Sequence, residues 1–164
     1  MDNYPQYARY VYDAAHRRGL LIDRTVILER QMDEYISHRF CSDEDARIDL
    51  LSLIISSRRM TAKDKVEVLL ALLKKHDAEF YKTHTGIKTT FETILATRNM
   101  YAHQMLDTRT ETVNAYDGNI ITFLNLSNPN DFVTHSKKEL EEVMEKITKL
   151  TNLLNMLNQS RKQQ

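Results

Sequence analysis

Residues that break helices are scarce in this chain. Its 164 residues include only 3 glycines and 2 prolines. These two residue types disfavour a helix interior most strongly, whereas Ala, Leu, Lys, Glu and Met, which favour it, are abundant here. The sequence therefore predicts an all-α fold, a bundle of helices. Because the length suits one hydrophobic core, we expect a single domain over residues 1–164.

Turn and cap residues divide the first half of the chain into separate helical segments. We expect helices over about 7–18 and about 22–40, with Gly19 as the break between them. The run Ser-Asp-Glu-Asp at 42–45 is typical of an N-cap followed by acidic residues and predicts the start of a third helix. Thr61 is expected to begin a fourth helix. Its predicted buried face consists of Val66, Leu69, Leu70 and Leu73.

Two longer helices are predicted in the second half. Gly86 precedes the first of them, Ile87 to Leu106. Ser136 has capping-box spacing for the last helix, along which apolar residues alternate steps of three and four. These residues are Leu140, Val143, Ile147, Leu150, Leu154 and Leu157. The stripe fits either a core helix of a bundle or a helix that also packs in a dimer. The polar tail 158–164 is expected to be frayed.

One region has the pattern of β-strands. The runs Thr112–Tyr116 and Ile120–Leu124 are rich in β-prone residues, and Asp-Gly-Asn at 117–119 between them is typical of a hairpin turn. The sequence therefore predicts a small β-hairpin around 112–124. Pro129 is expected to end this region.

Charge and cysteine content limit the class of protein. The chain has 23 basic and 23 acidic side chains, a formal net charge of +0. Proteins that bind long nucleic acid non-specifically are usually basic, so any nucleic-acid ligand is expected to be a short or exposed stretch and not a duplex wrapped over a large surface. The single cysteine, Cys41, forms no internal disulfide, and no stretch has the pattern of a signal peptide or a membrane-spanning helix. We expect a cytoplasmic protein.

An arginine interrupts the apolar face of the predicted helix 87–106. On a helical wheel this face consists of Ile87, Phe91, Ile94, Tyr101, Ala102 and Met105. Arg98 falls in its middle, and a guanidinium is not buried without a partner. Arg98 therefore either pairs inside the bundle with an acid such as Asp107, or this face opens onto a cleft. Asn99 and His103 are four residues apart and lie on one edge of the face.

The segment RNMYAH, which runs from Arg98 to His103, resembles the motif of the HEPN domain family. In that motif an arginine and a polar residue, here Asn99, precede a short spacer and a histidine. The motif lies on a late helix of a mostly helical chain, as in the family. The resemblance implies a four-helix core with extra helices, to which the hairpin around 112–124 is an insertion.

The resemblance also implies a function. Many HEPN domains are metal-independent endoribonucleases, found as toxins and phage-defence effectors, which dimerise so that motifs from both subunits line one cleft. By position, Arg98 and His103 are the catalytic pair and Asn99 orients them, with no cofactor and no metal. Other members are non-catalytic interaction modules or partners of a nucleotidyltransferase antitoxin.

The chemistry of these residue types suits RNA cleavage. RNA carries its own nucleophile, the 2′-hydroxyl, so the protein must move protons and stabilise charge on the phosphate. Histidine titrates near neutral pH, and the arginine fork binds phosphate oxygens. On spacing alone, however, Arg98 can equally be a structural ion-pair partner and His103 a half-exposed surface residue.

Two other groups of residues are interpreted as structural. Four residues whose side chains can bind metal ions lie close in sequence. Their spacing fits no zinc motif, so we interpret them as the polar end of a helix. They are His76, Asp77, Glu79 and His84. The N-terminal tyrosines are expected to pack the first helix. They are Tyr4, Tyr7, Tyr10 and Tyr12.

Overall fold

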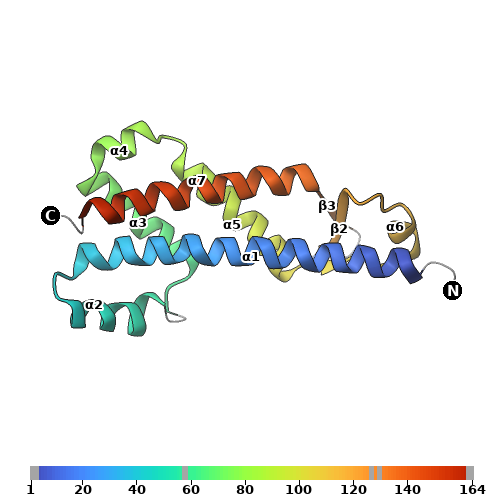
Figure 1. The fold of residues 1–164 in the computed structure, drawn as a ribbon, viewed down its shortest axis with the longest axis horizontal. Helices are drawn as coiled ribbons and strands as arrows, with labels where there is room; N and C mark the ends of the chain where they lie inside the picture. Colours follow the sequence, from blue (N-terminus) through green and yellow to red (C-terminus); the bar gives the residue numbers. More distant parts are fainter. Residues whose placement is uncertain (1–3, 57–58, 126–127, 129–130, 162–164) are drawn as a thin grey trace. The chain divides into compact units, whose positions relative to one another are not determined.

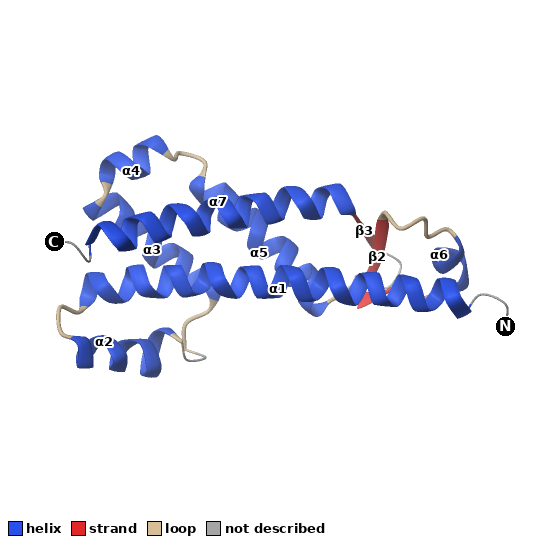
Figure 2. Ribbon diagram, in the orientation of Figure 1, coloured by secondary structure: helices blue, strands red, loops and turns tan. Residues whose placement is uncertain are grey.

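The computed structural model describes residues 4–56, 59–125, 128 and 131–161, and the described part is mostly helical with one small antiparallel sheet (Figures 1 and 2). The predicted fold class is therefore confirmed. The elements are α1 (Tyr4–Phe40), α2 (Glu44–Leu50), the π-helix η1 (Leu51–Ile55), α3 (Ala62–His76), α4 (Ala78–Thr83), α5 (Ile87–His103), β1 (Met105–Leu106), α6 (Thr110–Asn114), β2 (Ile120–Leu124), β3 (Phe132–Ser136) and α7 (Lys137–Arg161). Along these described residues, no helix is both long and apolar enough to cross a membrane.

The chain divides into two compact units. Unit 1 consists of residues 1–24 and 96–145, and unit 2 consists of residues 25–95 and 146–164. The chain passes from one unit into the other within α1, α5 and α7. Unit 1 contains the sheet and α6, whereas unit 2 contains α2, η1, α3 and α4.

Helix α1 is continuous, so the predicted break at Gly19 is wrong. Its buried residues follow steps of three and four through the glycine, and they include Tyr10, Ala14, Arg17 and Leu21 in unit 1 and Thr25, Leu28, Met32 and Tyr35 in unit 2. Gly19 is exposed, and a Cβ built there has no atom within 4 Å. A helical glycine costs only about 1 kcal/mol relative to alanine. Burial of the stripe outweighs that cost.

The sheet of unit 1 has the strand order β1-β2-β3, and both pairs are antiparallel. The predicted strand Ile120–Leu124 is confirmed as β2, but it pairs with β1 and β3, not with residues 112–116. Residues Thr110–Asn114 instead form α6, because the Thr112 hydroxyl and the Arg109 guanidinium both donate to Asp107 and fold this segment back. The end predicted for α5 is also wrong, because Met105–Leu106 pairs with β2 as β1.

Helix α7 begins at the predicted capping box. The Ser136 amide donates to the Glu139 carboxylate at 2.7 Å, and the Glu139 amide donates to the Ser136 hydroxyl at 3.2 Å. The predicted apolar stripe is buried from Leu140 to Leu154. The helix does not fray at 158, because the Asn158 side chain is buried and donates to the Gln31 carbonyl at 3.1 Å. Residues 162–164 and Pro129 lie outside the described residues.

Unit 2 is held together by apolar helix faces. The predicted residues Val66, Leu69, Leu70 and Leu73 of α3 are all buried. Helix α3 begins with a capping box between Thr61 and Asp64, and the Asp43 side chain caps α2 by accepting from the Ala46 amide at 2.9 Å. An ion pair between α3 and α1 is enclosed in this unit. The Lys65 Nζ lies 2.9 Å from Asp33 Oδ1, and the Lys65 side chain is only 7% exposed.

Candidate active site

The predicted catalytic residues lie in the last turns of α5, in unit 1. Arg98 is half-buried, and its Nη1 donates to the Asn99 Oδ1 at 3.1 Å. His103 is the last residue of α5 and is exposed. The structure thus joins Arg98 to Asn99. Among the described residues, His103 makes no hydrogen bond to either of them. Its imidazole is open to solvent and to a ligand.

Asp107, the acid that could have paired with Arg98, binds another arginine. Asp107 is fully buried and binds Arg109, with Nε at 2.9 Å from Oδ1 and Nη2 at 3.0 Å from Oδ2. Burial alone would raise the pKa of Asp107, but the hydrogen bonds from Arg109 and Thr112 outweigh it and hold that pKa below its usual value. The ion pair between Arg98 and Asp107 that the spacing allowed is therefore not formed.

Arg18 of α1 anchors the backbone that follows the motif. Its Nη2 donates to the Gln104 carbonyl at 3.2 Å, directly after His103. The Gln104 amide donates to the Met100 carbonyl at 3.0 Å, so the chain keeps a helical bond beyond the last residue of α5. Two further atoms, Arg18 Nε and Gln104 Oε1, are buried without a hydrogen-bond partner in the described part of the chain. Arg18 was not identified from the sequence, because its partner is 86 residues away.

Tyr101 fixes the motif helix against the sheet. It is fully buried, its ring centroid lies 4.9 Å from that of Phe123, and its hydroxyl shares a 3.0 Å hydrogen bond with the His135 Nδ1. Burial raises the pKa of Tyr101 to about 12, although the positive charge of Arg17 opposes this shift. Burial likewise lowers the pKa of His135 from its ordinary 6.5. Both groups are therefore neutral near pH 7, as a buried hydrogen-bonded pair requires.

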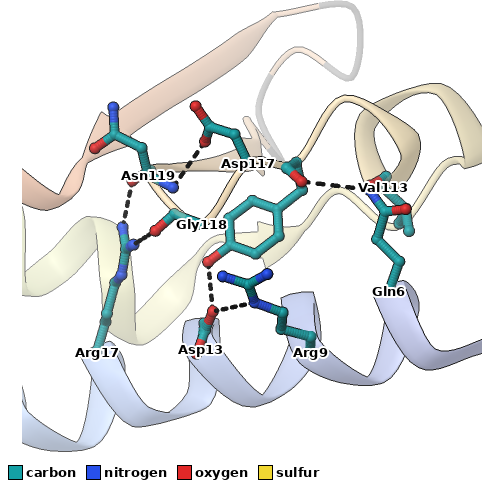
Figure 3. Close-up of polar contacts among 9 residues, drawn as sticks. Gln6, Arg9, Asp13, Arg17, Val113, Asp117, Gly118 and Asn119 are labelled. Carbon is teal, nitrogen blue, oxygen red and sulfur yellow. Dashed lines mark hydrogen bonds and ion pairs between the residues drawn. The ribbon is translucent and has the colours of Figure 1, made fainter.

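The turn between α6 and β2 is attached to α1 by side chains (Figure 3). Arg17 Nη1 donates to the Asn119 carbonyl and Nη2 to the Gly118 carbonyl, both at 2.7 Å. The Tyr116 hydroxyl donates to the Asp13 carboxylate at 2.7 Å. Gly118 has a φ of 97°, a conformation that glycine adopts without strain. Arg17 was not identified from the sequence, although its place on the buried stripe of α1 is a usable signal.

The N-terminal tyrosines, and Asp77 among the residues that can bind metal ions, have structural contacts. Only Tyr10 of the four N-terminal tyrosines is buried, and its hydroxyl contacts both backbone groups of Thr122, so the expected packing is wrong for the other three. Asp77 accepts hydrogen bonds from the Tyr35 hydroxyl and from Arg39 Nη2, which makes it a structural residue of unit 2. No group of three His, Cys, Asp or Glu side chains within the described ranges is placed to hold a metal ion.

Comparison with known proteins does not assign the chain to a family. No family model matches it, and neither does any curated protein or solved structure. The HEPN resemblance therefore stays a prediction from the motif.

Proposed function

We propose that this protein is a metal-independent endoribonuclease of the HEPN type, with Arg98, Asn99 and His103 as its active-site residues. In this proposal it acts as a homodimer in which both copies of the motif line one cleft. A role as a toxin or a phage-defence effector follows from the same resemblance.

One observation carries the proposal: a half-buried arginine, its hydrogen-bonded asparagine and an exposed histidine occupy consecutive turns of one helix, and the nearby acid Asp107 is bound elsewhere. Arg98 has donors left over after its bond to Asn99, and these suit phosphate oxygens. His103 is exposed and therefore accessible for proton transfer to or from the 2′-hydroxyl or the 5′-oxygen.

The supporting elements suit a rigid site. Tyr101 in the spacer of the motif is locked against Phe123 and His135, and Arg18 holds the carbonyl after His103. Catalytic groups act best when neighbouring side chains restrict their movement. Arg18 and Tyr101 are therefore positioning residues in this proposal.

The decisive experiment is incubation of the purified protein with mixed RNAs in EDTA. We expect cleavage that survives chelation and leaves 2′,3′-cyclic phosphate ends, and we expect it to be absent from His103→Ala. His16→Ala is the matched control, since His16 is an exposed histidine on α1 of the same unit. Activity that disappears in EDTA and returns with a divalent ion would contradict the mechanism.

The composite site is tested by mixing two inactive proteins. If the cleft combines residues from both subunits, a mixture of Arg98→Ala and His103→Ala subunits should recover activity after exchange. If the wild-type protein is a monomer by light scattering at micromolar concentration, the dimeric site is wrong.

A second candidate is a non-catalytic interaction module, including a partner subunit of a nucleotidyltransferase antitoxin. The observation that favours it is charge. Unit 1, which holds the motif, has 8 basic and 11 acidic side chains, a formal net charge of −3. A negative unit is not favoured for binding a polyanion. RNA that is bound with equal affinity by wild type and Arg98→Ala, and is never cleaved, would support this candidate.

A further inference from the structure

The three-stranded sheet of unit 1 has one buried face and one exposed face. Along β2, Ile121 and Phe123 are fully buried, whereas Leu124 is only half-buried. The strand register pairs Leu124 with Met105 of β1 on one side and with Phe132 of β3 on the other. Paired residues of antiparallel strands share a face, and successive residues alternate between faces. Leu124, Met105 and Phe132 therefore form a row on the exposed face, where Met105 is 55% exposed and Phe132 38%.

The phenyl ring in this row is stacked with a guanidinium. The Arg109 Cζ lies 4.1 Å from the centroid of the Phe132 ring. The buried Asp107 carboxylate fixes this guanidinium by accepting hydrogen bonds from its Nε and Nη2. The Arg109 side chain is nevertheless 56% exposed. The structure thus holds a flat guanidinium in place on the ring and leaves part of it open to a ligand. We call Met105, Arg109, Leu124 and Phe132 the sheet platform.

The charges at the sheet platform do not favour a phosphate. The Arg109 guanidinium is balanced by its ion pair with Asp107. Asp131, which precedes Phe132 in the chain, is exposed and negative. A ligand is therefore held here by stacking and apolar contact and not by its own charge. Flat arginine and aromatic side chains are surfaces on which nucleobases stack, and every base has a π-face for that contact.

The sheet platform is continuous with the proposed active site. Met105 follows His103 by two residues, and the row from Met105 to Phe132 crosses two strand spacings, roughly 10 Å. The next pair along the same face is Thr122 with Thr134. A threonine hydroxyl both donates and accepts hydrogen bonds, so this pair can contact the polar edge of a stacked base.

We propose that the sheet platform binds an unpaired nucleobase of the RNA substrate close to the cleaved bond. This inference rests on the proposed ribonuclease function and adds the class of substrate to it, a single-stranded segment. The base stacks on the pair formed by Arg109 and Phe132. A base inside a duplex is covered by its neighbours and does not offer its face in this way.

The test measures binding of the full-length protein to short 2′-O-methylated adenine oligonucleotides by fluorescence anisotropy. The 2′-O-methyl group blocks the nucleophile, so the probe is not cleaved. A series of probes has one base removed at successive positions. We expect the removal of a base at one or two positions to weaken binding about five- to hundredfold, the range for loss of one stacked base, and removal elsewhere to have little effect.

Substitutions locate the stacked base. Phe132→Leu keeps an apolar side chain without a ring, and Arg109→Lys keeps the charge without the flat group, so both should bind the intact probe about tenfold more weakly. In both variants the loss of a base should matter equally at every position. Ile120→Ala is the matched control, because Ile120 is 45% exposed at the other end of β2 and is not part of the sheet platform. Thermal unfolding checks that each variant is folded.

Two further measurements identify the contact as stacking. The slope of log affinity against log salt should be the same for wild type and Phe132→Leu, because no phosphate contact is lost. The chain contains no tryptophan, so Phe132→Trp adds a single fluorophore and retains a ring. Its binding should match that of wild type, and its fluorescence should be quenched by the intact probe.

The outcomes separate this proposal from the ribonuclease function. If RNA is cleaved and Phe132→Leu keeps the wild-type KM, the sheet platform is wrong and the function stands. If no RNA is cleaved but Phe132→Leu and base removal weaken the probe as expected, the sheet platform stands and the function is wrong. A wild-type protein that does not bind the probe overturns the sheet platform, as does self-association that Phe132→Leu abolishes, which would identify a second copy as the occupant.

Discussion

Units 1 and 2 use different contacts to hold their elements together. In unit 1, side chains of α1 bind backbone groups of distant segments: Arg17 binds the turn at 118–119, and Tyr10 binds Thr122. In unit 2, buried apolar side chains lie on α1, α3 and α7, and most of the polar contacts between distant segments join side chains, as in the pairs Lys65–Asp33 and Arg39–Asp77, although Asn158 binds the Gln31 carbonyl. The net charges of the two units are opposite, −3 and +3.

Backbone hydrogen bonding explains this difference. A helix satisfies its own amides and carbonyls, so a unit made only of helices can be closed by apolar contacts. Turns and short strands leave backbone groups unpaired, and unit 1 supplies arginine and tyrosine side chains to bind them. Polar side chains therefore hold the turns and strands of unit 1 in place, and the candidate catalytic residues lie in the same unit.

The largest effect that distinguishes the units should be on RNA cleavage. His103→Ala should lower the cleavage rate about 10²–10⁴-fold and Arg98→Ala about 10²–10³-fold, with a smaller loss for Asn99→Ala. Because His103 and Asn99 are exposed, these two variants should unfold at nearly the wild-type temperature. Rates come from single-turnover cleavage in EDTA. An active His103→Ala protein, together with a clearly destabilised Arg98→Ala protein, would assign the motif a structural role.

In unit 2, removal of Lys65 should affect stability and not chemistry. Lys65→Ala leaves the Asp33 carboxylate buried without its partner, which should cost about 3–5 kcal/mol in the free energy of unfolding. The double variant Lys65→Met, Asp33→Leu should recover most of this loss, since apolar residues of similar size can replace a buried pair. Urea unfolding measures both. A loss for Lys65→Ala no larger than that of an exposed ion pair would show that Asp33 gains water on truncation.

In unit 1, loss of Arg17 should release the turn at 118–119. Arg17→Leu removes two hydrogen bonds of 2.7 Å from a side chain that is almost fully buried, and should cost about 2–3 kcal/mol. Arg24→Leu is the control, because Arg24 is an exposed arginine of the same helix and unit. Chemical denaturation gives the energies, and faster amide exchange at Asn119 should accompany the loss. Equal effects of the two substitutions would contradict the role of Arg17.

The smallest effect should be a dependence of the stability of unit 1 on pH. Burial lowers the pKa of His135 in the folded protein below its ordinary 6.5, while the Glu139 carboxylate raises it and Arg17 lowers it further. The unfolded chain then binds a proton more readily than the folded one. The contribution of neutral His135 to the free energy of unfolding is therefore fully present above pH 6.5. It decreases as the pH drops through and below that value.

The variant His135→Gln should lose less stability than wild type over this acidic range, as measured by thermal unfolding at a series of pH values. His16→Gln, at an exposed histidine, should behave as wild type does. If His135→Gln and wild type respond identically to acid, the Tyr101–His135 pair does not sense pH.

The sequence by itself determined the features that depend on residues close together in the chain. The capping box of Ser136 and Glu139, the cap of α2 and the apolar stripe from Leu140 to Leu154 were all predicted, because their partners are three to seven residues apart. The motif from Arg98 to His103 was visible for the same reason. The α-helical class followed from these local patterns.

Only the tertiary structure decided features whose partners are far apart. Gly19 stays helical because the stripe around it is buried, and the strand predicted at Thr112–Tyr116 gave way to α6 because Asp107 binds Thr112 and Arg109. Asn158 is ordered by Gln31, 127 residues away, and Tyr101 is paired with His135, 34 residues away. Local propensities amount to about 1 kcal/mol per residue or less, so burial and long-range hydrogen bonds override them, and no local pattern shows where those bonds form.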